Sequence, residues 1–136
     1  LLADTLLKDA LDSERFDMVV IPGGMEGSQA LTDYQPFIAY LQKMATKKKL
    51  VGAICAAPMV LGRAGLLNNI TFTAYPGVLN DSDFPNARNT GSAIEEDNNI
   101  MTSRGPGTAL DFALAILEKL EGKETRTTVE KQLVRT

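Results

Sequence analysis

The chain has 136 residues, of which 44% are hydrophobic and 23% charged, and its formal net charge is −3. These values are typical of one globular domain with a single core. The slightly acidic balance argues against a protein that binds nucleic acid or anionic membranes. No apolar run approaches the roughly 20 residues that a membrane-spanning helix needs. We therefore expect neither a nucleic acid nor a membrane as a partner.

Two residue counts restrict the chemistry further. Histidine is absent, which excludes Ser-His and Cys-His pairs and histidine-based zinc sites within this chain. Cysteine occurs once, as Cys55, so the chain can form no internal disulfide or multi-thiolate metal site, and we expect no metal. A lone thiol suits a reducing compartment, which favours the cytoplasm. Cys55 is the strongest candidate for a nucleophile.

The first half of the chain alternates strand and helix patterns. The apolar, β-branched run 16–24, stopped by its Pro-Gly-Gly sequence, predicts a strand that is buried on both faces. Apolar residues spaced by three and four predict an amphipathic helix over 33–48. A second buried strand is predicted over 50–55, a helix over 56–66 and a third strand over 71–74.

The second half has more turns. Residues 75–90 are rich in Pro, Gly, Asn and Asp and are predicted to form a loop, and 92–102 a hairpin. A sharp turn is expected over 103–107, followed by a helix over 108–122 that opens on a capping box formed by its Thr and Asp. Residues 123–133 are predicted to form a last short helix. The alternation predicts an α/β fold with a mainly parallel sheet.

Three strands and a hairpin make a small sheet for this class, and the chain opens on Leu1 without a methionine. We interpret residues 1–136 as a single domain whose first strand-helix-strand segment is missing from this chain. A sheet without those strands has open edges, so the missing segment is expected as a partner of this chain.

Cys55 is placed where chemistry is expected, since it closes a predicted strand and stands just before a predicted helix. Ligands of open α/β sheets bind at the carboxyl ends of the strands. A helix N-terminus supplies partial positive charge and free N–H groups, which favour a thiolate. The order of strand, tight turn and helix resembles a nucleophile elbow. The alternative is a buried structural cysteine that packs as a small hydrophobe.

The glycines after the first predicted strand are the second candidate feature. Gly23 and Gly24 can present backbone N–H groups to an oxyanion near the Cys55 sulfur. The alternative is a plain turn that ends the strand. Neither this pair nor the glycines of 105–107 match a phosphate loop or a dinucleotide fingerprint, and we expect no cofactor.

Three motifs, at 19–24, 53–58 and 102–108, occur in an order and at spacings that resemble the ThiJ/PfpI family, on the branch of the parkinsonism-associated protein deglycase and its bacterial relatives. The resemblance implies a flavodoxin-like three-layer α/β sandwich of the class I glutamine amidotransferase-like type, usually a homodimer. It also implies cofactor-free glyoxalase activity on methylglyoxal, deglycation of aldehyde adducts, and redox-regulated chaperone behaviour.

The resemblance also assigns residues. It makes Cys55 the reactive elbow cysteine, which is readily oxidised, and gives the backbone N–H groups of Gly24 and Ala56 to the oxyanion site. Tyr75 stands where some relatives have a histidine, and either contacts substrate or simply packs. The remaining matched residues lie near the cysteine and the dimer contact: Ser103, Arg104, Gly105 and Pro106.

Two departures from the family pattern bear on mechanism. The family's acid partner of the cysteine is a glutamate on the segment that would precede Leu1, and Glu26 does not match its position. The family's proteases have a histidine directly after the cysteine, where this chain has Ala56, so peptidase activity is disfavoured. The sequence therefore favours a glyoxalase or deglycase, with a redox-sensing chaperone as the alternative and an inactive relative as a third possibility.

Overall fold

The structure, a computed structural model, describes residues 1–13 and 15–135 of the chain. The helices are α1 (Leu7–Ala10), α2 (Met25–Thr32), α3 (Gln35–Thr46), α4 (Pro58–Arg63), α5 (Ala109–Glu121) and α6 (Lys123–Gln132). The strands are β1 (Met18–Ile21), β2 (Leu50–Ile54), β3 (Thr71–Phe72), β4 (Arg88–Asn89), β5 (Ile94–Asp97) and β6 (Ile100–Ser103). Short 3₁₀ helices are η1 (Asp81–Asp83) and η2 (Pro106–Thr108).

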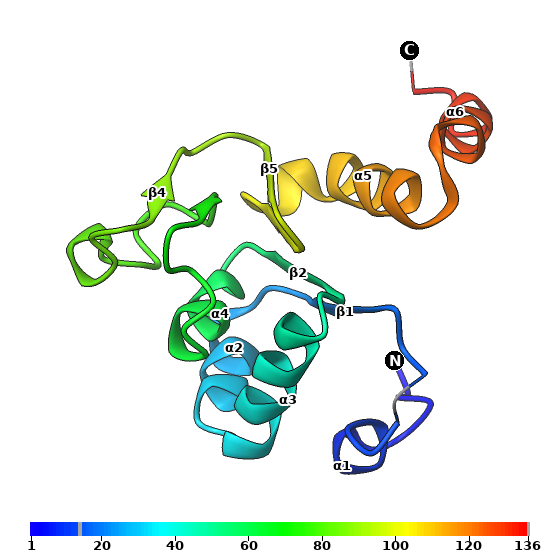
Figure 1. Cartoon of the computed structure of the whole chain (residues 1–136). Coiled ribbons are helices and arrows are strands. Elements are labelled where there is room, and N and C mark those ends of the chain that lie inside the picture. The colour runs from blue at the N-terminus through cyan, green and yellow to red at the C-terminus, as the bar shows by residue number, and fades with distance from the viewer. Residues whose placement is uncertain (14, 136) are drawn as a thin grey trace.

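The central sheet has the strand order β1-β2-β6-β5. β1, β2 and β6 run parallel, whereas β5 pairs antiparallel with β6, and the two form the predicted hairpin. β3 and β4 form a separate two-stranded parallel sheet. Helices α2, α3 and α4 cover one face of the central sheet and α5 lies over the other (Figure 1). The predicted α/β class with a mainly parallel sheet is confirmed.

The main core lies between β2 and the helices α3 and α4. Leu41 of α3, Val51 of β2 and Leu61 of α4 are all fully buried there. Burying each such side chain contributes roughly 1.5–3 kcal/mol. The apolar stripe of α3 predicted from the spacing is this buried face, which comprises Phe37, Ile38, Leu41 and Met44.

The opposite face is covered mainly by α5, and a glycine lets this helix come close. A Cβ atom on Gly52 of β2 would lie 3.2 Å from the Phe112 ring and 2.9 Å from the Met18 side chain. The cover does not extend fully over β1, where Val20 is 44% exposed while Ile21 on the other face is buried. The prediction that this strand is buried on both faces is therefore wrong for the described residues.

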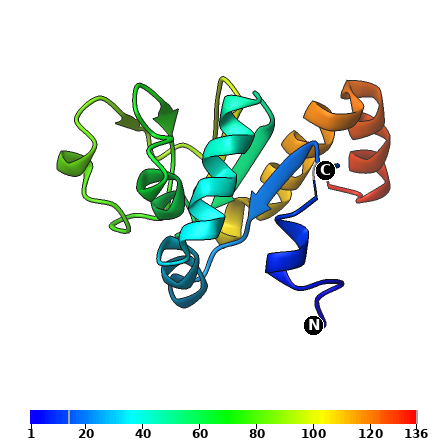
Figure 2. The same cartoon turned by 60° about the horizontal axis from the view of Figure 1, so that its bottom comes forward.

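β1 also stands at one edge of the sheet, since β2 is the strand it pairs with among the described residues (Figure 2). An apolar cavity of about 210 Å³ lies along this edge. It is lined by β1, by α1 and by Phe16, Phe37 and Tyr40. An edge strand beside apolar surface is a place where a further strand can pair.

Three local expectations need correction. The segment 25–32, for which no helix was predicted, forms α2 directly after the glycine pair. The predicted loop 75–90 contains η1 and the short strand β4. The capping box of Thr108 and Asp111 does not form, because the Thr108 hydroxyl accepts the Gly105 N–H (3.1 Å) and Asp111 forms an ion pair with Arg135.

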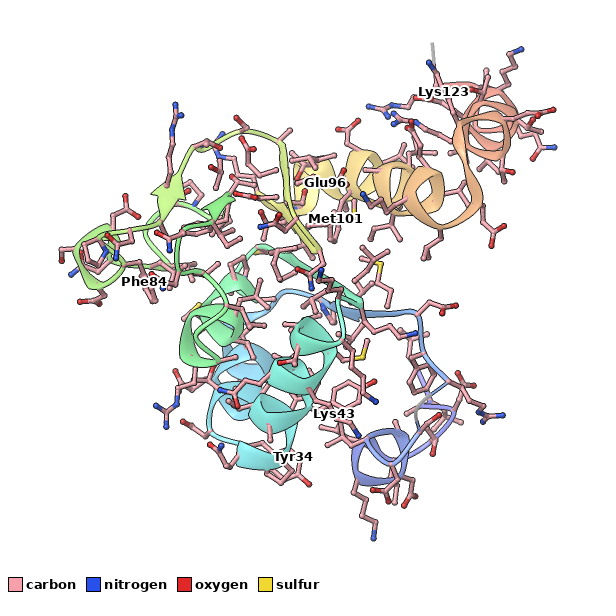
Figure 3. All side chains as sticks on the ribbon, in the orientation of Figure 1. Tyr34, Lys43, Phe84, Glu96, Met101 and Lys123 are labelled. Atoms are coloured by element: carbon pink, nitrogen blue, oxygen red, sulfur yellow. The ribbon has the colours of Figure 1, made fainter. Side chains whose placement is uncertain are left out.

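Ion pairs hold the two C-terminal helices together. α6 buries no residue of its own. Arg126 of α6 donates to the Glu118 carboxylate of α5 at 2.6 Å and lies 3.5 Å from Glu130. The Glu118 carboxylate raises the pKa of Arg126 above its ordinary value by accepting this hydrogen bond. Figure 3 shows Lys123 at the start of α6, remote from Met101 in the central sheet.

None of the helices formed by residues 1–13 and 15–135 has the length and apolar character needed to cross a membrane.

Candidate active site

The carboxyl ends of three parallel strands meet at one edge of the sheet. Ile21, the last residue of β1, is in register with Ala53 of β2, and Ile54 of β2 is in register with Ser103 at the end of β6. The residues that follow each strand are therefore neighbours in space. This is the edge at which open α/β sheets bind their ligands.

Cys55 is held at this edge in an unusual backbone conformation. Its φ is +66°, in the left-handed region that residues other than glycine rarely adopt. Two hydrogen bonds hold it there: the Cys55 N–H donates to the Ser103 carbonyl (3.0 Å), and the Cys55 carbonyl accepts the Tyr75 N–H (2.9 Å). Such strain is found at nucleophile elbows, where it aims the side chain away from the sheet.

Gly23 lies directly against the cysteine. A Cβ atom built on Gly23 would be 2.7 Å from the Cys55 Cβ and 3.3 Å from its Sγ. The glycine thus leaves room for the thiol, which is free and half-buried. The sequence pattern of two glycines after a strand indicated backbone donors here, but it did not show that Gly23 has to lack a side chain.

Two backbone N–H groups beside the cysteine remain available. Within the described part of the chain, neither Gly24 nor Ala56 donates its N–H to a backbone carbonyl. Gly24 caps α2 with φ +100°, and Ala56 lies in the turn that the Ala57 N–H closes onto the Ile54 carbonyl at 3.1 Å. Free donors flanking a nucleophile are what an oxyanion site requires.

The turn after β6 has a rigid internal network. Ser103 is fully buried, and its hydroxyl donates to the Ala93 carbonyl (2.9 Å) and lies 2.6 Å from the Thr108 hydroxyl. Ser103 therefore positions the turn, and its side chain does not face the cysteine's solvent edge. Gly105 packs against Tyr75, since a Cβ atom on Gly105 would lie 3.3 Å from the Tyr75 ring.

A cavity of about 270 Å³ opens beside this turn. It is lined by Tyr75, Pro76, Arg104 and the residues 105–108. Tyr75 is 49% exposed, so its ring forms an open wall. Pro76 was not among the predicted site residues; it lies here because it follows Tyr75 directly.

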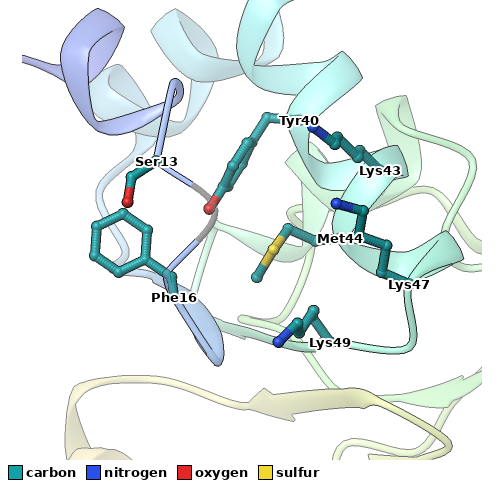
Figure 4. Close-up of a pocket in the computed structure, with 7 residues that line it drawn as sticks. All are labelled: Ser13, Phe16, Tyr40, Lys43, Met44, Lys47 and Lys49. Atoms are coloured by element: carbon teal, nitrogen blue, oxygen red, sulfur yellow. The ribbon is translucent and has the colours of Figure 1, made fainter.

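A third cavity is too small and too remote to hold a substrate of Cys55. It has a volume of about 30 Å³ and lies at the start of β2, whereas Cys55 follows the end of that strand. Figure 4 shows the residues that line it, among them Tyr40, Met44 and Lys49. A volume of this size has room for little more than water.

The predicted site residues therefore fall into two groups. Gly24, Cys55, Ala56 and Ser103 lie at or just after the carboxyl ends of the strands. Tyr75, Arg104, Gly105 and Pro106 line the adjacent cavity. Glu26, which did not match the family's acid, is an exposed residue in the first turn of α2. Across residues 1–13 and 15–135, no group of three or more Cys, Asp or Glu residues is arranged to hold a metal ion.

Comparisons with known proteins agree with this geometry. Protein DJ-1 homolog B of Arabidopsis thaliana is 40% identical over 125 residues, covering 91% of this chain but only 28% of the relative. The glutathione-independent glyoxalase DJ-1 of Schizosaccharomyces pombe is 32% identical over 123 residues, covering 89% of this chain and 63% of the relative. The chain thus spans less than two thirds of the length of these two relatives.

Solved structures match along nearly the whole chain. The crystal structure of Drosophila melanogaster DJ-1beta superposes with a TM-score of 0.89 at 37% identity, covering 100% of this chain and 73% of the other. The oxidized form of Toxoplasma gondii DJ-1 gives a TM-score of 0.84 at 34% identity, covering 97% and 71%. The model of the DJ-1/PfpI family matches residues 1–119. The resemblance found in the three motifs is confirmed, and the chain belongs to the DJ-1/PfpI family.

Proposed function

We propose that this protein is a cysteine-dependent, cofactor-free glyoxalase that acts on reactive 2-oxoaldehydes such as methylglyoxal, or on their adducts with proteins and nucleotides. The observation that carries the proposal is the strained Cys55, held between Ser103 and Tyr75 with Gly23 clearing space beside its thiol. A relative named as a glutathione-independent glyoxalase supports it, because such an enzyme has to supply a nucleophile of its own.

In the proposed reaction, the Cys55 thiolate adds to the aldehyde carbon and forms a carbon–sulfur bond. The former carbonyl oxygen takes up a proton to give a hemithioacetal, and the Gly24 and Ala56 N–H groups stabilise the negative charge that develops on it. A proton then moves from the former aldehyde carbon to the neighbouring carbon, and the hydroxyl proton passes to the former ketone oxygen, which yields a thioester of the 2-hydroxy acid. Water hydrolyses the thioester and releases the acid and the thiolate.

The proton transfers require an acid–base group. We assign this role to a carboxyl group on a strand-helix-strand segment outside residues 1–136 that would complete the sheet at the free edge of β1. The apolar cavity of about 210 Å³ along that edge supports such an addition. In this proposal the complete domain is a cytoplasmic homodimer.

The experiment that tests the proposal follows methylglyoxal consumption and lactate formation by the complete domain, with the strand-helix-strand segment present, as wild type, Cys55→Ser and Cys55→Ala. We expect both variants to lose at least about 100-fold in rate, because removing the nucleophile removes the covalent step. Ser82→Ala, an exposed position in η1, serves as the control and should retain full activity. Unchanged turnover of methylglyoxal by Cys55→Ala would contradict the proposal.

Oxidative-stress sensing by the same thiol is the second candidate. Cys55 is a free, half-buried cysteine, and the Toxoplasma relative was crystallised in a form described as oxidized. Two equivalents of peroxide would convert the thiol to a sulfinic acid and release two waters. Intact mass after mild peroxide should rise by about 32 Da in wild type but not in Cys55→Ala. The sensing role additionally requires that this change alter chaperone activity towards an aggregating client.

A further inference from the structure

The cavity of about 270 Å³ beside Cys55 carries a positive charge that the proposed reaction does not use. Its charged lining residue is Arg104, and no Asp or Glu is among the residues that line it. The main chain of Arg104 is anchored, since its N–H donates to the Ala93 carbonyl at 3.1 Å. The cavity therefore has a cation on a fixed backbone without a neutralising acid in its wall.

The Arg104 guanidinium is available for a ligand. It is exposed and forms no ion pair or hydrogen bond with any described residue, whereas Arg126 and Arg135 are both paired with carboxylates. A guanidinium presents several N–H donors in a planar fork that matches a carboxylate. An unpaired arginine that lines a cavity is thus suited to bind one anionic group.

Two uncharged groups in the cavity wall can also donate hydrogen bonds to an anion. The Tyr75 hydroxyl forms no hydrogen bond with the described residues, so it can donate to a ligand. The residues 105–108 lead into the N-terminus of α5, which has 13 residues, and the Gly107 N–H donates to no backbone carbonyl within the described ranges. Each of these groups favours an anion over a cation in the cavity.

Backbone hydrogen bonds connect the wall of the cavity to Cys55. Tyr75 donates its N–H to the Cys55 carbonyl, and Arg104 directly follows Ser103, whose carbonyl accepts the Cys55 N–H. The side chain of Cys55 is not itself part of the wall. A ligand whose anionic end lies in the cavity would need a short spacer to place its aldehyde at the sulfur.

We propose that this cavity is a carboxylate subsite, and that the substrates this site favours are 2-oxoaldehydes with a carboxylate a few atoms from the aldehyde. This inference rests on the proposed glyoxalase function and specifies its substrate class. The single arginine, without a lysine or a phosphate loop, fits a carboxylate with one negative charge. Arg104 is then a specificity-determining residue that contacts the substrate's distal end.

Kinetics with matched substrates test the subsite. The probes are dioxovalerate, a 2-oxoaldehyde with a carboxylate two methylenes from its ketone, and its methyl ester. In Arg104→Gln we expect KM for the acid to rise about tenfold, as the loss of a charge-assisted hydrogen bond implies, with kcat and the ester nearly unchanged. Arg63→Gln, an exposed arginine at the end of α4, makes the same charge change and should alter neither KM.

A second measurement is independent of turnover. 3-Maleimidopropionate and N-ethylmaleimide both alkylate a thiol, but only the first is an anion, and its carboxylate is separated from the reacting carbon by a spacer of several atoms. We expect the ratio of their rates at Cys55 to fall severalfold in Arg104→Gln and to stay unchanged in Arg63→Gln. A complete domain that is inactive on 2-oxoaldehydes but shows this fall would contradict the glyoxalase proposal while leaving the anion subsite intact.

Three results would overturn the subsite itself. The first is an equal effect of Arg104→Gln on the acid and on the ester. The second is an alkylation ratio that is the same in Arg104→Gln and wild type. The third is a changed sedimentation coefficient in Arg104→Gln, because the arginine would then serve an interface between copies of the chain.

Discussion

Gly23 and Cys55 lie so close that a side chain on the glycine would overlap the cysteine: a Cβ atom there would be 2.7 Å from the Cys55 Cβ. The contact arises because β1 and β2 are parallel neighbours that end together, so that the residues after each strand meet. Real Cβ atoms do not approach to this distance, and the nearby Ile54 carbonyl (3.3 Å) cannot move without disturbing β2. The glycine therefore keeps the cysteine in position and its thiol uncovered.

Gly23→Ala is expected to damage both stability and thiol reactivity. Relief of the overlap has to come from backbone movement, and we expect a loss of about 1–3 kcal/mol in the free energy of unfolding, as for other overpacked sites. Chemical denaturation and the rate of Cys55 alkylation by iodoacetamide measure the two effects.

Gly27→Ala is the matched control, since a Cβ atom there would have no neighbour within 4 Å. Gly27 lies inside α2, where alanine is the better helix former, so this variant should gain up to about 1 kcal/mol. Equal stability of the two variants would contradict the close contact at Gly23.

The left-handed backbone of Cys55 makes a prediction about stability that is separate from catalysis. Because glycine adopts a φ of +66° without steric cost, Cys55→Gly should be more stable than Cys55→Ala by about 1 kcal/mol. Thermal or urea denaturation of the two variants provides the measurement.

Lys48 offers a comparison, since it has φ +57° just after α3 but no role at the site. Lys48→Gly should likewise be more stable than Lys48→Ala. If Cys55→Gly were the less stable of the two cysteine variants, the strain assigned to the elbow would be wrong.

Removing the side-chain hydroxyl is expected to have opposite effects on stability at Ser28 and at Thr73. Ser28 of α2 is 1% exposed, and its hydroxyl has no hydrogen-bond partner among residues 1–13 and 15–135. Ser28→Ala removes this unsatisfied group and should stabilise the protein by about 1 kcal/mol. The Thr73 hydroxyl donates to the Ser92 carbonyl at 2.7 Å. Thr73→Val leaves that carbonyl without its partner and should cost about 1–2 kcal/mol.

Urea denaturation of both variants, with the slope checked for constancy, measures this difference in sign. A destabilised Ser28→Ala would contradict the assignment of the Ser28 hydroxyl as an unsatisfied group.

Arg126 is expected to hold α6 against α5. The guanidinium bridges Glu118 and Glu130, and α6 has no buried residue to replace that contact. Arg126→Gln should lower amide protection in 123–132 and reduce stability by about 0.5–1 kcal/mol, the range of partly exposed pairs. Hydrogen exchange monitored by mass spectrometry localises the effect, with Arg88→Gln on β4 as the control. The difference should shrink in 1 M salt, where the Debye length is about 3 Å.

The sequence by itself determined the elements whose patterns are local. The branched run before the glycine pair, the three-and-four spacing of α3 and the turn between β5 and β6 follow from periodicity and turn chemistry, and all three lie where they were predicted. The position of Cys55 between a strand and a helix could likewise be predicted from the sequence. These patterns succeed because burial of one face and the φ preferences of Gly and Pro act within a few residues.

Only the tertiary structure decided how those elements meet. The helix α2 has a weak apolar pattern, and it is stabilised by packing on α4. The exposure of Val20 depends on how far α5 extends over the sheet, and the contact of Gly23 with Cys55 depends on strand register. Arg104 reaches the cysteine's edge because β6 pairs with β2 across about 50 residues of chain. Contacts between distant segments depend on the packing of the whole domain, which no local pattern records.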